Sequence, residues 1–468
     1  MLSILKYLLI LISLSALASD TKTNIIFILA DDLGYGELGS YGQEKIQTPE
    51  LDKMADAGIR FTNHYSGYTT CTMSRKVLMT GKHIANLPMG DKIPSITIAG
   101  LLKNAGYKTA MIGKWGMMGR PGHDNSPGEH GFDHVFTYDN QGFAHFYYPE
   151  FMWRNGEKVH YPTNKNLLTD EGYIKEKHHG VYSHDEFTKD ALGFIEENKD
   201  TPFFLYLPYT IPHAEITVPH DSVEPYLKLN WPETPKIIGG GGSKDPGYGS
   251  QYVKGYCGQK YPHAAYAGMI SRMDRDVGRI LDLLKKLKIE ENTLVLFGSD
   301  NGASPEGGQT LEFFQSSGKL RGDKRSIYEA GTRTPFIAYW PKTIQAGQVT
   351  DHISAYCDFM ATACDVAGIK TPEHSDGVSY LPSLLGNRHQ QAQRPYIFNA
   401  WKSWSSVRVK EWKLIANRKK DLSPAERFEL YNLEKDEGEM KNLATQHPEK
   451  VQSLHKLINK ISKRHYTP

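Results

Sequence analysis

Nearly continuous apolar runs alternate with segments of helical periodicity along most of the chain. Runs at 24–30, 202–209 and 292–300 have the length and apolar content of strands buried inside a sheet. Between such runs, apolar residues recur every three or four positions, most regularly over 266–287, as on one face of a helix. Strands that alternate with helices predict a mostly parallel sheet with helices on both faces, an α/β fold.

Weaker signals extend the same pattern. Further strands are predicted at 107–113 and 335–340, and further helices at 97–106 and 190–200. Between Val218 and Pro262 the pattern is lost. The glycine-rich segment 237–250 inside this gap predicts a flexible loop.

The pattern changes after about Leu385. Three short strands are predicted there, followed by a closing helix, at 395–401, 405–417, 428–436 and 447–463. We therefore expect a large α/β domain at 19–384. A smaller α+β subdomain, with a short antiparallel sheet and the closing helix, is expected at 385–468.

The N-terminus has the layout of a secretory signal peptide. An early lysine precedes an apolar run from Tyr7 to Leu14, and the small residues Ala16 and Ala18 follow. A membrane anchor is the alternative, but this run is shorter than the span of about 20 residues that a bilayer requires. We expect residues 1–18 to be removed from a periplasmic or extracellular protein that has no stable membrane insertion.

Charge and cysteine content narrow the class of protein. The 468 residues include 55 basic and 53 acidic ones, so a net charge of +2 gives no electrostatic basis for a nucleic-acid partner. Four cysteines are few for a disulfide framework in an exported chain of this length. Cys357 and Cys364 fall in a helix-like segment and are expected to be buried, although one bridge stays open.

Acidic residues follow two of the predicted strands. Asp31 and Asp32 come after the first strand, and Asp300 and Asn301 come at the end of the strand at 292–300. Each pair alone fits a turn. The carboxyl ends of parallel strands share one edge of a sheet, however, so three carboxylates and one amide oxygen are expected to meet there. Carboxylates that repel one another at one site predict a hard cation, Ca²⁺ or Mg²⁺.

Cationic and titratable side chains occupy similar places. Lys114 ends the strand at 107–113, His213 follows the strand at 202–209, and Lys324 precedes the strand at 335–340. A lone lysine or histidine is usually a surface or structural residue. Two lysines and a histidine beside a metal ion fit the binding of a phosphate or sulfate ester.

Seven motifs together resemble the type I sulfatases of the alkaline phosphatase superfamily. In chain order they are "ADDLGYGELGSYG", "CTMSRKVLMTGKH", "TAMIGKWG", "YLPYTIPHAE", "FGSDNG", "LRGDKRSIYEAGTRTPFIAYWP" and "ELYNLEKDEGEMKNL". They run from about residue 22 to the closing helix. The resemblance implies an alkaline-phosphatase-like sheet sandwiched by helices, and hydrolysis of sulfate esters.

The resemblance also implies roles for the candidate residues. Cys71, in a motif of the type C-x-(P/A)-x-R, would be oxidised to formylglycine by a maturation enzyme, and its hydrated aldehyde would attack sulfur. Ca²⁺ would be held by the group made from Cys71 together with Asp31, Asp32, Asp300 and Asn301. Arg75 would orient that group, Lys114 and Lys324 would bind sulfate, and His213 would protonate the leaving oxygen or bind sulfate.

Two positions depart from the family pattern. Met73 stands where proline or alanine is usual, and Gly116 stands where the family has a histidine that contacts the formylglycine. His145, in "NQGFAHFYYP", is our candidate to take over that role. It could equally be a packed histidine among aromatic residues. His145 and Gln141 of the same segment are assigned to the substrate side.

The expected substrate is a sulfated oligosaccharide or polysaccharide, with a preference for galactose or N-acetylgalactosamine units. The 27 tyrosines and seven tryptophans are a weak indication in the same direction. Two alternatives stay open. One is a phosphatase or phosphonate ester hydrolase of the same superfamily, and the other is an inactive exported glycan-binding homologue.

Overall fold

The computed structural model describes residues 22–87, 93–117, 125–169, 173–176, 178–236, 256–419 and 424–465. The predicted signal peptide at 1–18 and the predicted flexible loop at 237–250 lie outside these residues. Within the described chain, no helix is long and apolar enough to cross a bilayer.

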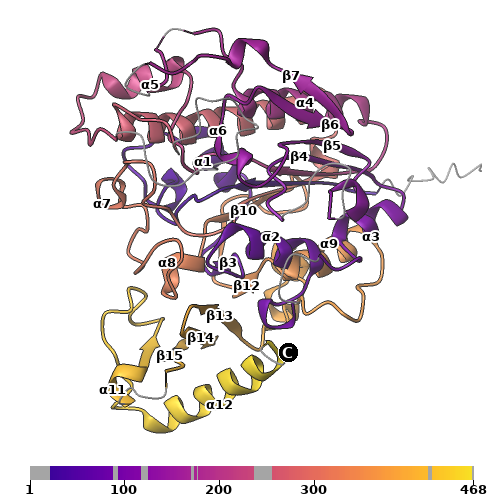
Figure 1. Cartoon of the computed structure of the whole chain (residues 1–468). Coiled ribbons are helices and arrows are strands. Elements are labelled where there is room, and N and C mark those ends of the chain that lie inside the picture. Colours follow the sequence, from indigo (N-terminus) through magenta and orange to yellow (C-terminus); the bar gives the residue numbers. More distant parts are fainter. Residues whose placement is uncertain are drawn as a thin grey trace, which may run out of the picture.

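A central sheet of ten described strands dominates the molecule (Figure 1). Its five middle strands run parallel in the order β9, β1, β8, β4, β5. The three predicted apolar runs are the neighbours β9, β1 and β8, and every residue in them is buried. The bounds, in sheet order, are Thr293–Ser299, Asn24–Ala30, Phe203–Pro208, Lys108–Gly113 and His134–Thr137.

Helices cover both faces of this sheet (Figure 1). On one face lie α1, α4 and α6, with α5 packed on α6, and on the other lie α2, α3 and α9. The first group has the bounds Pro49–Asp56, Ser183–Glu197, Pro262–Lys286 and, for α5, His220–Leu227. The second group has the bounds Cys71–Thr80, Ile98–Asn104 and Asp358–Ala367.

Strand β1 shows how the core divides into two layers. Successive side chains of a strand point to opposite faces, so Ile26 and Ile28 pack under α4 and α6. Ile25, Phe27 and Leu29 pack under α2, α3 and α9. The predicted fold class, a mostly parallel sheet between helical layers, is confirmed.

The edges of the sheet are not parallel throughout. β10 runs antiparallel to both β9 and β2, and β11 pairs with β2. At the other edge β6 and β7 form a hairpin that turns at Asn155 and Gly156, which both have positive φ, as the pair favours in two-residue turns. These edge strands have the bounds Phe336–Tyr339, Ile59–Phe61, Gln348–Thr350, Phe151–Arg154 and Glu157–His160.

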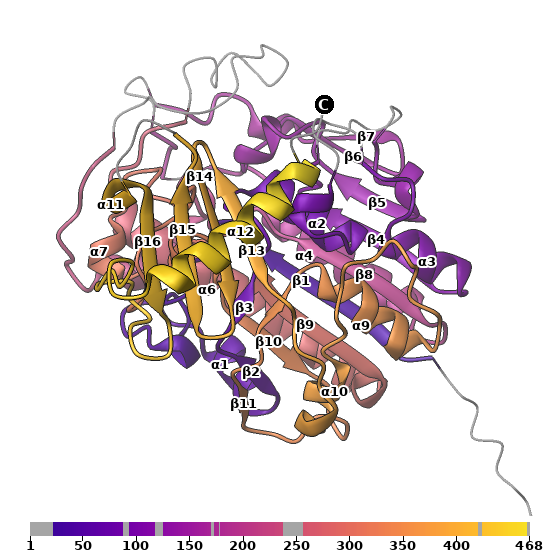
Figure 2. The same cartoon turned by 90° about the horizontal axis from the view of Figure 1, so that it is seen from below.

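The C-terminal part of the chain forms an antiparallel sheet of four described strands, with α12 packed across it (Figure 2). The predicted single strand at 405–417 is wrong, because the chain turns back at Lys410, whose φ is positive. The boundary predicted at residue 385, between a large domain and a smaller subdomain, stays a prediction. The bounds of β13, β14, β15, β16 and α12 are Ile397–Trp401, Trp404–Val409, Trp412–Asn417, Phe428–Asn432 and Pro448–His465.

Two further expectations need correction or completion. Helix α5 lies inside the gap of 218–262, where no element is predicted, since it is short and contains Pro225. All four cysteines are free, so the bridge that the sequence left open is not formed.

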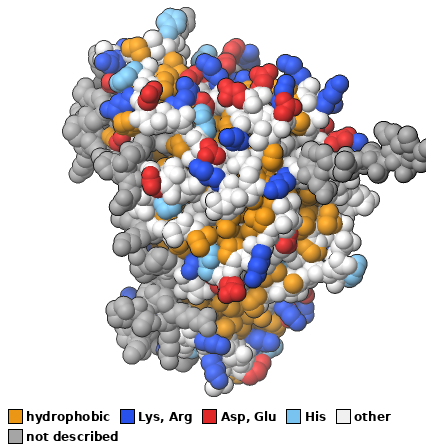
Figure 3. Space-filling model, turned by 90° about the vertical axis from the view of Figure 1, so that its right-hand side faces the viewer, with side chains coloured by type: hydrophobic (Ala, Val, Ile, Leu, Met, Phe, Trp, Pro, Cys, Tyr) orange, Lys and Arg blue, Asp and Glu red, His pale blue; other side chains and the backbone are white. Residues whose placement is uncertain are grey.

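On the face of the molecule shown in Figure 3, basic and acidic side chains are intermixed, as the small net charge leads one to expect.

Candidate active site

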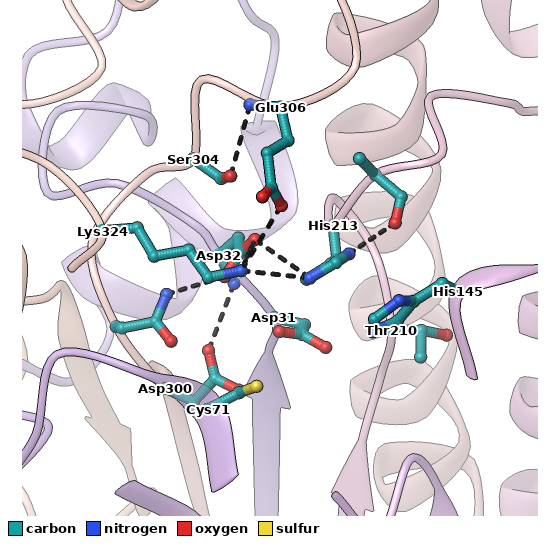
Figure 4. Close-up of polar contacts among 12 residues, drawn as sticks. Asp31, Asp32, Cys71, His145, Thr210, His213, Asp300, Ser304, Glu306 and Lys324 are labelled. Atoms are coloured by element: carbon teal, nitrogen blue, oxygen red, sulfur yellow. Dashed lines mark hydrogen bonds and ion pairs between the residues drawn. The ribbon is translucent and has the colours of Figure 1, made fainter. Parts of the chain in front are cut away.

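The two acidic pairs meet at one edge of the sheet. Strands β1 and β9 are parallel neighbours in which Ala30 pairs with Ser299, so the residues that follow leave the sheet side by side. The Asp32 backbone N–H donates to Asp300 Oδ1 at 3.2 Å, and Asn301 Nδ2 donates to Asp32 Oδ1 at 2.7 Å. All four side chains of these pairs are buried (Figure 4).

Cys71 lies beside this cluster as the first residue of α2. Its Sγ lies within 4.8 Å of carboxylate oxygens of Asp31 and Asp300. Lys114 Nζ is 4.0 Å from the sulfur, and Gln141 Nε2 is 3.6 Å from it. Burial raises the pKa of the Cys71 thiol, so the unmodified side chain would be a poor nucleophile near neutral pH.

Arg75 follows Cys71 by one helical turn and holds the carboxylates. Its Nε and one terminal nitrogen lie 2.9 and 2.8 Å from Asp300 Oδ2, and the other terminal nitrogen donates to the backbone carbonyl of Lys114. A further contact of 3.4 Å reaches Asp31. Arg75 therefore ties α2 to the ends of β1, β4 and β9.

Each lysine neutralises one aspartate of the first pair. Lys114 Nζ donates to Asp31 Oδ2. Lys324 Nζ donates to Asp32 Oδ2 at 2.6 Å (Figure 4). Burial alone would raise the pKa of Asp31, but Lys114 above all, with smaller effects of His213, Arg75 and Lys324, holds it below its usual range. Burial and the charge of Asp31 raise the pKa of Asp300.

The donor set fits a hard divalent cation. Among the described residues, Asp31 Oδ1 and Asn301 Oδ1 are buried and accept no hydrogen bond. Orphaned buried oxygens beside mutually repelling carboxylates are what a bound Ca²⁺ or Mg²⁺ would satisfy. That Asp31, Asp32, Asp300 and Asn301 bind such an ion stays a prediction.

Two histidines, His213 buried and His145 partly buried, stack at the side of the cluster. The rings of His145 and His213 have centroids 4.2 Å apart and planes inclined by 21°. His213 Nε2 is 3.0 Å from Lys324 Nζ and 3.4 Å from Asp32 Oδ2. Burial, then the neighbouring cation, lowers the pKa of His213, and burial, then His213, lowers that of His145.

Gln141 and His145 both lie at the site but face different groups. Gln141 approaches the sulfur of Cys71. His145 Nδ1 lies 3.2 Å from the hydroxyl of Tyr256, and no described residue hydrogen-bonds to its Nε2, which is buried. His145 thus stands beside His213, and Gln141 stands beside the residue expected to be modified.

Residues at the rim have no clear signal in the sequence. Glu306 Oε2 lies 3.9 Å from Lys324 Nζ (Figure 4). Its other carboxylate oxygen lies 2.9 Å from Arg325. Glu306 follows β9 by seven residues, in a loop that also contains glycine, serine and proline. In the sequence, only its closeness to the Asp300 motif could have indicated that it lies at the site. Tyr256 borders a segment without periodicity.

Comparisons with known proteins agree with this geometry. The family model for sulfatases matches residues 23–369, and the model named "N-sulphoglucosamine sulphohydrolase, C-terminal" matches residues 321–465. The N-acetylgalactosamine-6-O-sulfatase of Bacteroides thetaiotaomicron is 28% identical over an alignment 516 residues long, gaps included. This alignment covers 95% of this chain and 94% of the relative.

Further similarity extends to an animal enzyme and a solved structure. The N-acetylgalactosamine-6-sulfatase of Mus musculus is 30% identical over 440 residues, covering 87% of this chain and 74% of the relative. The crystal structure of Ps i-CgsB in complex with k-i-k-neocarrahexaose has a TM-score of 0.75 at 26% identity and covers 96% of this chain and 94% of its own.

Proposed function

This chain belongs to the sulfatase family of the alkaline phosphatase superfamily and hydrolyses sulfate esters, and from that premise we propose that it is an exported, formylglycine-dependent and Ca²⁺-dependent glycan sulfatase. The observation that carries the proposal is the meeting of Cys71 with two acidic pairs and two lysines at one sheet edge. A sulfate monoester requires such a balance of charges, because an anion must bind beside anionic metal ligands.

The metal site would be built from side chains that leave β1 and β9. Asp31, Asp32, Asp300 and Asn301 supply oxygen ligands from two rigid strands, and Arg75 fixes the orientation of Asp300. When bound, the ion would offset the repulsion among these carboxylates and polarise the sulfate. Mg²⁺ is the alternative to Ca²⁺.

Formylglycine would arise from Cys71 through a maturation enzyme. As its hydrate, it would supply one hydroxyl to attack sulfur while the S–O bond to the sugar breaks. The second hydroxyl would then lose its proton, so that the aldehyde re-forms as sulfate leaves. Cys71 suits this role because it begins a helix, where unpaired N–H groups favour negative charge. Met73, the departure from the usual motif, is partly buried and packs against the core.

Lys114, Lys324 and His213 would receive the substrate. In the described structure the lysines neutralise Asp31 and Asp32, and these ammonium groups would also bind sulfate oxygens. His213 Nδ1 lies 2.5 Å from the carbonyl of Ala214, so the neutral ring keeps its proton there and Nε2 accepts from Lys324. To protonate a leaving oxygen, His213 must first gain a proton at Nε2, and a bound sulfate anion would favour that gain.

A glycan is the substrate class that best fits the similarities. One relative is named for N-acetylgalactosamine 6-sulfate, and a solved neighbour holds neocarrahexaose. We therefore propose sulfated galactose or N-acetylgalactosamine units of an oligosaccharide or polysaccharide. The Nε2 of His145 is buried without a partner among the described residues, and a sugar hydroxyl would satisfy it only if the substrate displaces the groups that cover it.

The proposal is tested by co-expressing the chain with a formylglycine-generating enzyme. The mass of the Cys71 peptide reports conversion, and sulfate release is measured from N-acetylgalactosamine 6-sulfate and from sulfated galactan fragments. A converted protein that releases sulfate supports the proposal. An unmodified thiol with retained glycan binding favours the inactive homologue, and faster cleavage of phosphonate esters favours the other hydrolase. An N-terminus at Ser19 in the secreted fraction tests export.

A further inference from the structure

Position 116 has no room for a side chain, because Arg75 already occupies the space that the side chain would need. Its φ is +75°, a conformation that L-residues with side chains rarely adopt. A Cβ built there would lie 2.6 Å from Arg75 Cδ, far inside van der Waals contact. The stem of Arg75 therefore occupies this volume, and it must do so for the guanidinium to reach Asp300.

Gln141 closes the same space from another part of the chain. Its Oε1 would be 3.5 Å from a Cβ at Gly116, and its Nε2 is 3.6 Å from Cys71 Sγ. The loop that carries it is pinned on both sides, since Asn140 Oδ1 accepts the N–H of Gly142 at 2.9 Å and that of Phe143 at 3.3 Å. Gln141 thus reaches Cys71 from a fixed backbone.

We infer that Gln141 is the positioning residue for the group made from Cys71, an inference that rests on the proposed function. Its carboxamide has a donor in Nε2, already turned toward the sulfur, and an acceptor in Oε1, which is buried and has no partner within the described chain. A hydrated aldehyde presents hydroxyls that both donate and accept, so one carboxamide matches it. His145, our candidate from the sequence, instead stacks on His213.

The chemistry of the neighbours explains why an amide suits this position. Cys71 already faces the carboxylates of Asp31 and Asp300, and a third carboxylate would add repulsion. An amide keeps one geometry at every pH at which the protein is folded, because it neither gains nor loses a proton there. Gln141 therefore holds the modified group in place, and proton transfer is left to titratable side chains.

The test compares Gln141→Leu and Gln141→Glu with Gln391→Leu. Gln391 is a buried amide that bonds to Ser379, Ser383 and Ala392, away from the site, so its variant controls for lost stability. Conversion of Cys71 is first measured by mass in each variant. An aminooxy reagent, which captures the aldehyde but not its hydrate, is then added to the folded proteins.

We expect Gln141→Leu to be labelled about 3- to 10-fold faster than the parent, the size of one lost hydrogen bond, with kcat lowered at least as much and KM nearly unchanged. Gln141→Glu should lose kcat as well, through repulsion. Gln391→Leu should label and turn over as the parent does. Parental labelling in Gln141→Leu, or a raised KM with parental kcat, would show that Gln141 contacts sugar and would overturn the inference.

The experiment distinguishes failure of the inference about Gln141 from failure of the proposed function. If Cys71 proves unconverted in the parent, the proposed function fails, but the contact to sulfur can still be tested on the thiol. A crystal structure of the unconverted protein should then keep Gln141 Nε2 at the 3.6 Å from Cys71 Sγ found here. A Gln141 side chain turned away from the sulfur would refute the inference in that form as well.

Discussion

Single residues at this site act through the charges beside them. Asp32 has a φ of +69°, and its carboxylate accepts hydrogen bonds from both Lys324 and Asn301. Asp31 is paired with Lys114 in the same way. Each of these carboxylates is therefore offset by a cation that would also bind sulfate.

Replacing Cys71 by alanine should abolish sulfate release and leave the fold intact. Alanine cannot be oxidised to an aldehyde, while the change removes only one sulfur atom from a site at the start of α2. The free energy of unfolding should fall by no more than about 1 kcal/mol. Sulfate release, thermal unfolding and calorimetric binding of the sulfated sugar are the measurements. Turnover by the variant at the parental rate would refute the formylglycine mechanism.

Replacing His213 by alanine should separate its two possible roles. A sugar alkoxide needs a proton as it leaves, whereas nitrophenolate does not, so loss of a general acid should cost about 10²- to 10⁴-fold on a sulfated sugar and far less on nitrophenyl sulfate. Both rates are measured on protein with equal conversion of Cys71. Equal losses on the two substrates would assign His213 to sulfate binding, which its contact with Lys324 also permits.

At the scale of elements, the predictable features are those with a local signal. In the sequence, β1, β8 and β9 are recognisable from their unbroken apolar runs. Because β1 and β9 are neighbours in the sheet, Asp31 and Asp300 lie close together. The hairpin β6–β7 has no such run, and only its Asn155–Gly156 turn marks it. Gln141 could not be placed beside Cys71 from sequence, since 70 residues separate them and tertiary packing alone makes the contact.

The small subdomain is joined to the active-site loop by buried charges. Lys413 of β15 lies 2.9 Å from Glu329 and 2.8 Å from Glu439, and all three are buried. Glu329 begins α8 (Glu329–Thr332), which follows the loop that carries Lys324. Lys413 therefore offsets two carboxylates where the four-stranded sheet meets the helix that follows the loop of Lys324.

Replacing Lys413 by leucine should lower the free energy of unfolding by about 3–5 kcal/mol, because it removes the cation that pairs with the buried carboxylate of Glu439. Glu329 keeps its contacts with Arg333 and Arg408. Lys53→Leu is the matched control, since Lys53 pairs with Glu50 at the surface and its loss should cost about 1 kcal/mol or less. Denaturant titration measures both. A loss as small for Lys413→Leu as for the control would mean that the cluster contributes little to holding the subdomain.

At the scale of the whole molecule, the metal site would connect distant parts of the chain. Its two halves are separated by about 270 residues in sequence and come together only in the folded sheet. An ion bound there would bind the native state and not the unfolded chain. Any such ligand stabilises the fold by mass action, in proportion to the logarithm of its concentration relative to its dissociation constant.

Removal of divalent cations should therefore lower both activity and stability. Relative to chelator-treated protein, Ca²⁺ at about 100 times its dissociation constant should raise the free energy of unfolding by about 2.7 kcal/mol. Thermal unfolding is followed with a chelator, with Ca²⁺ and with Mg²⁺, in the parent and in Asp300→Asn. The variant loses one ligand charge, so its midpoint should respond far less to added ion, and the difference between the two responses reports binding at this site alone. A parental midpoint that neither ion shifts would contradict the metal site, and a response to Mg²⁺ without one to Ca²⁺ would reassign the ion.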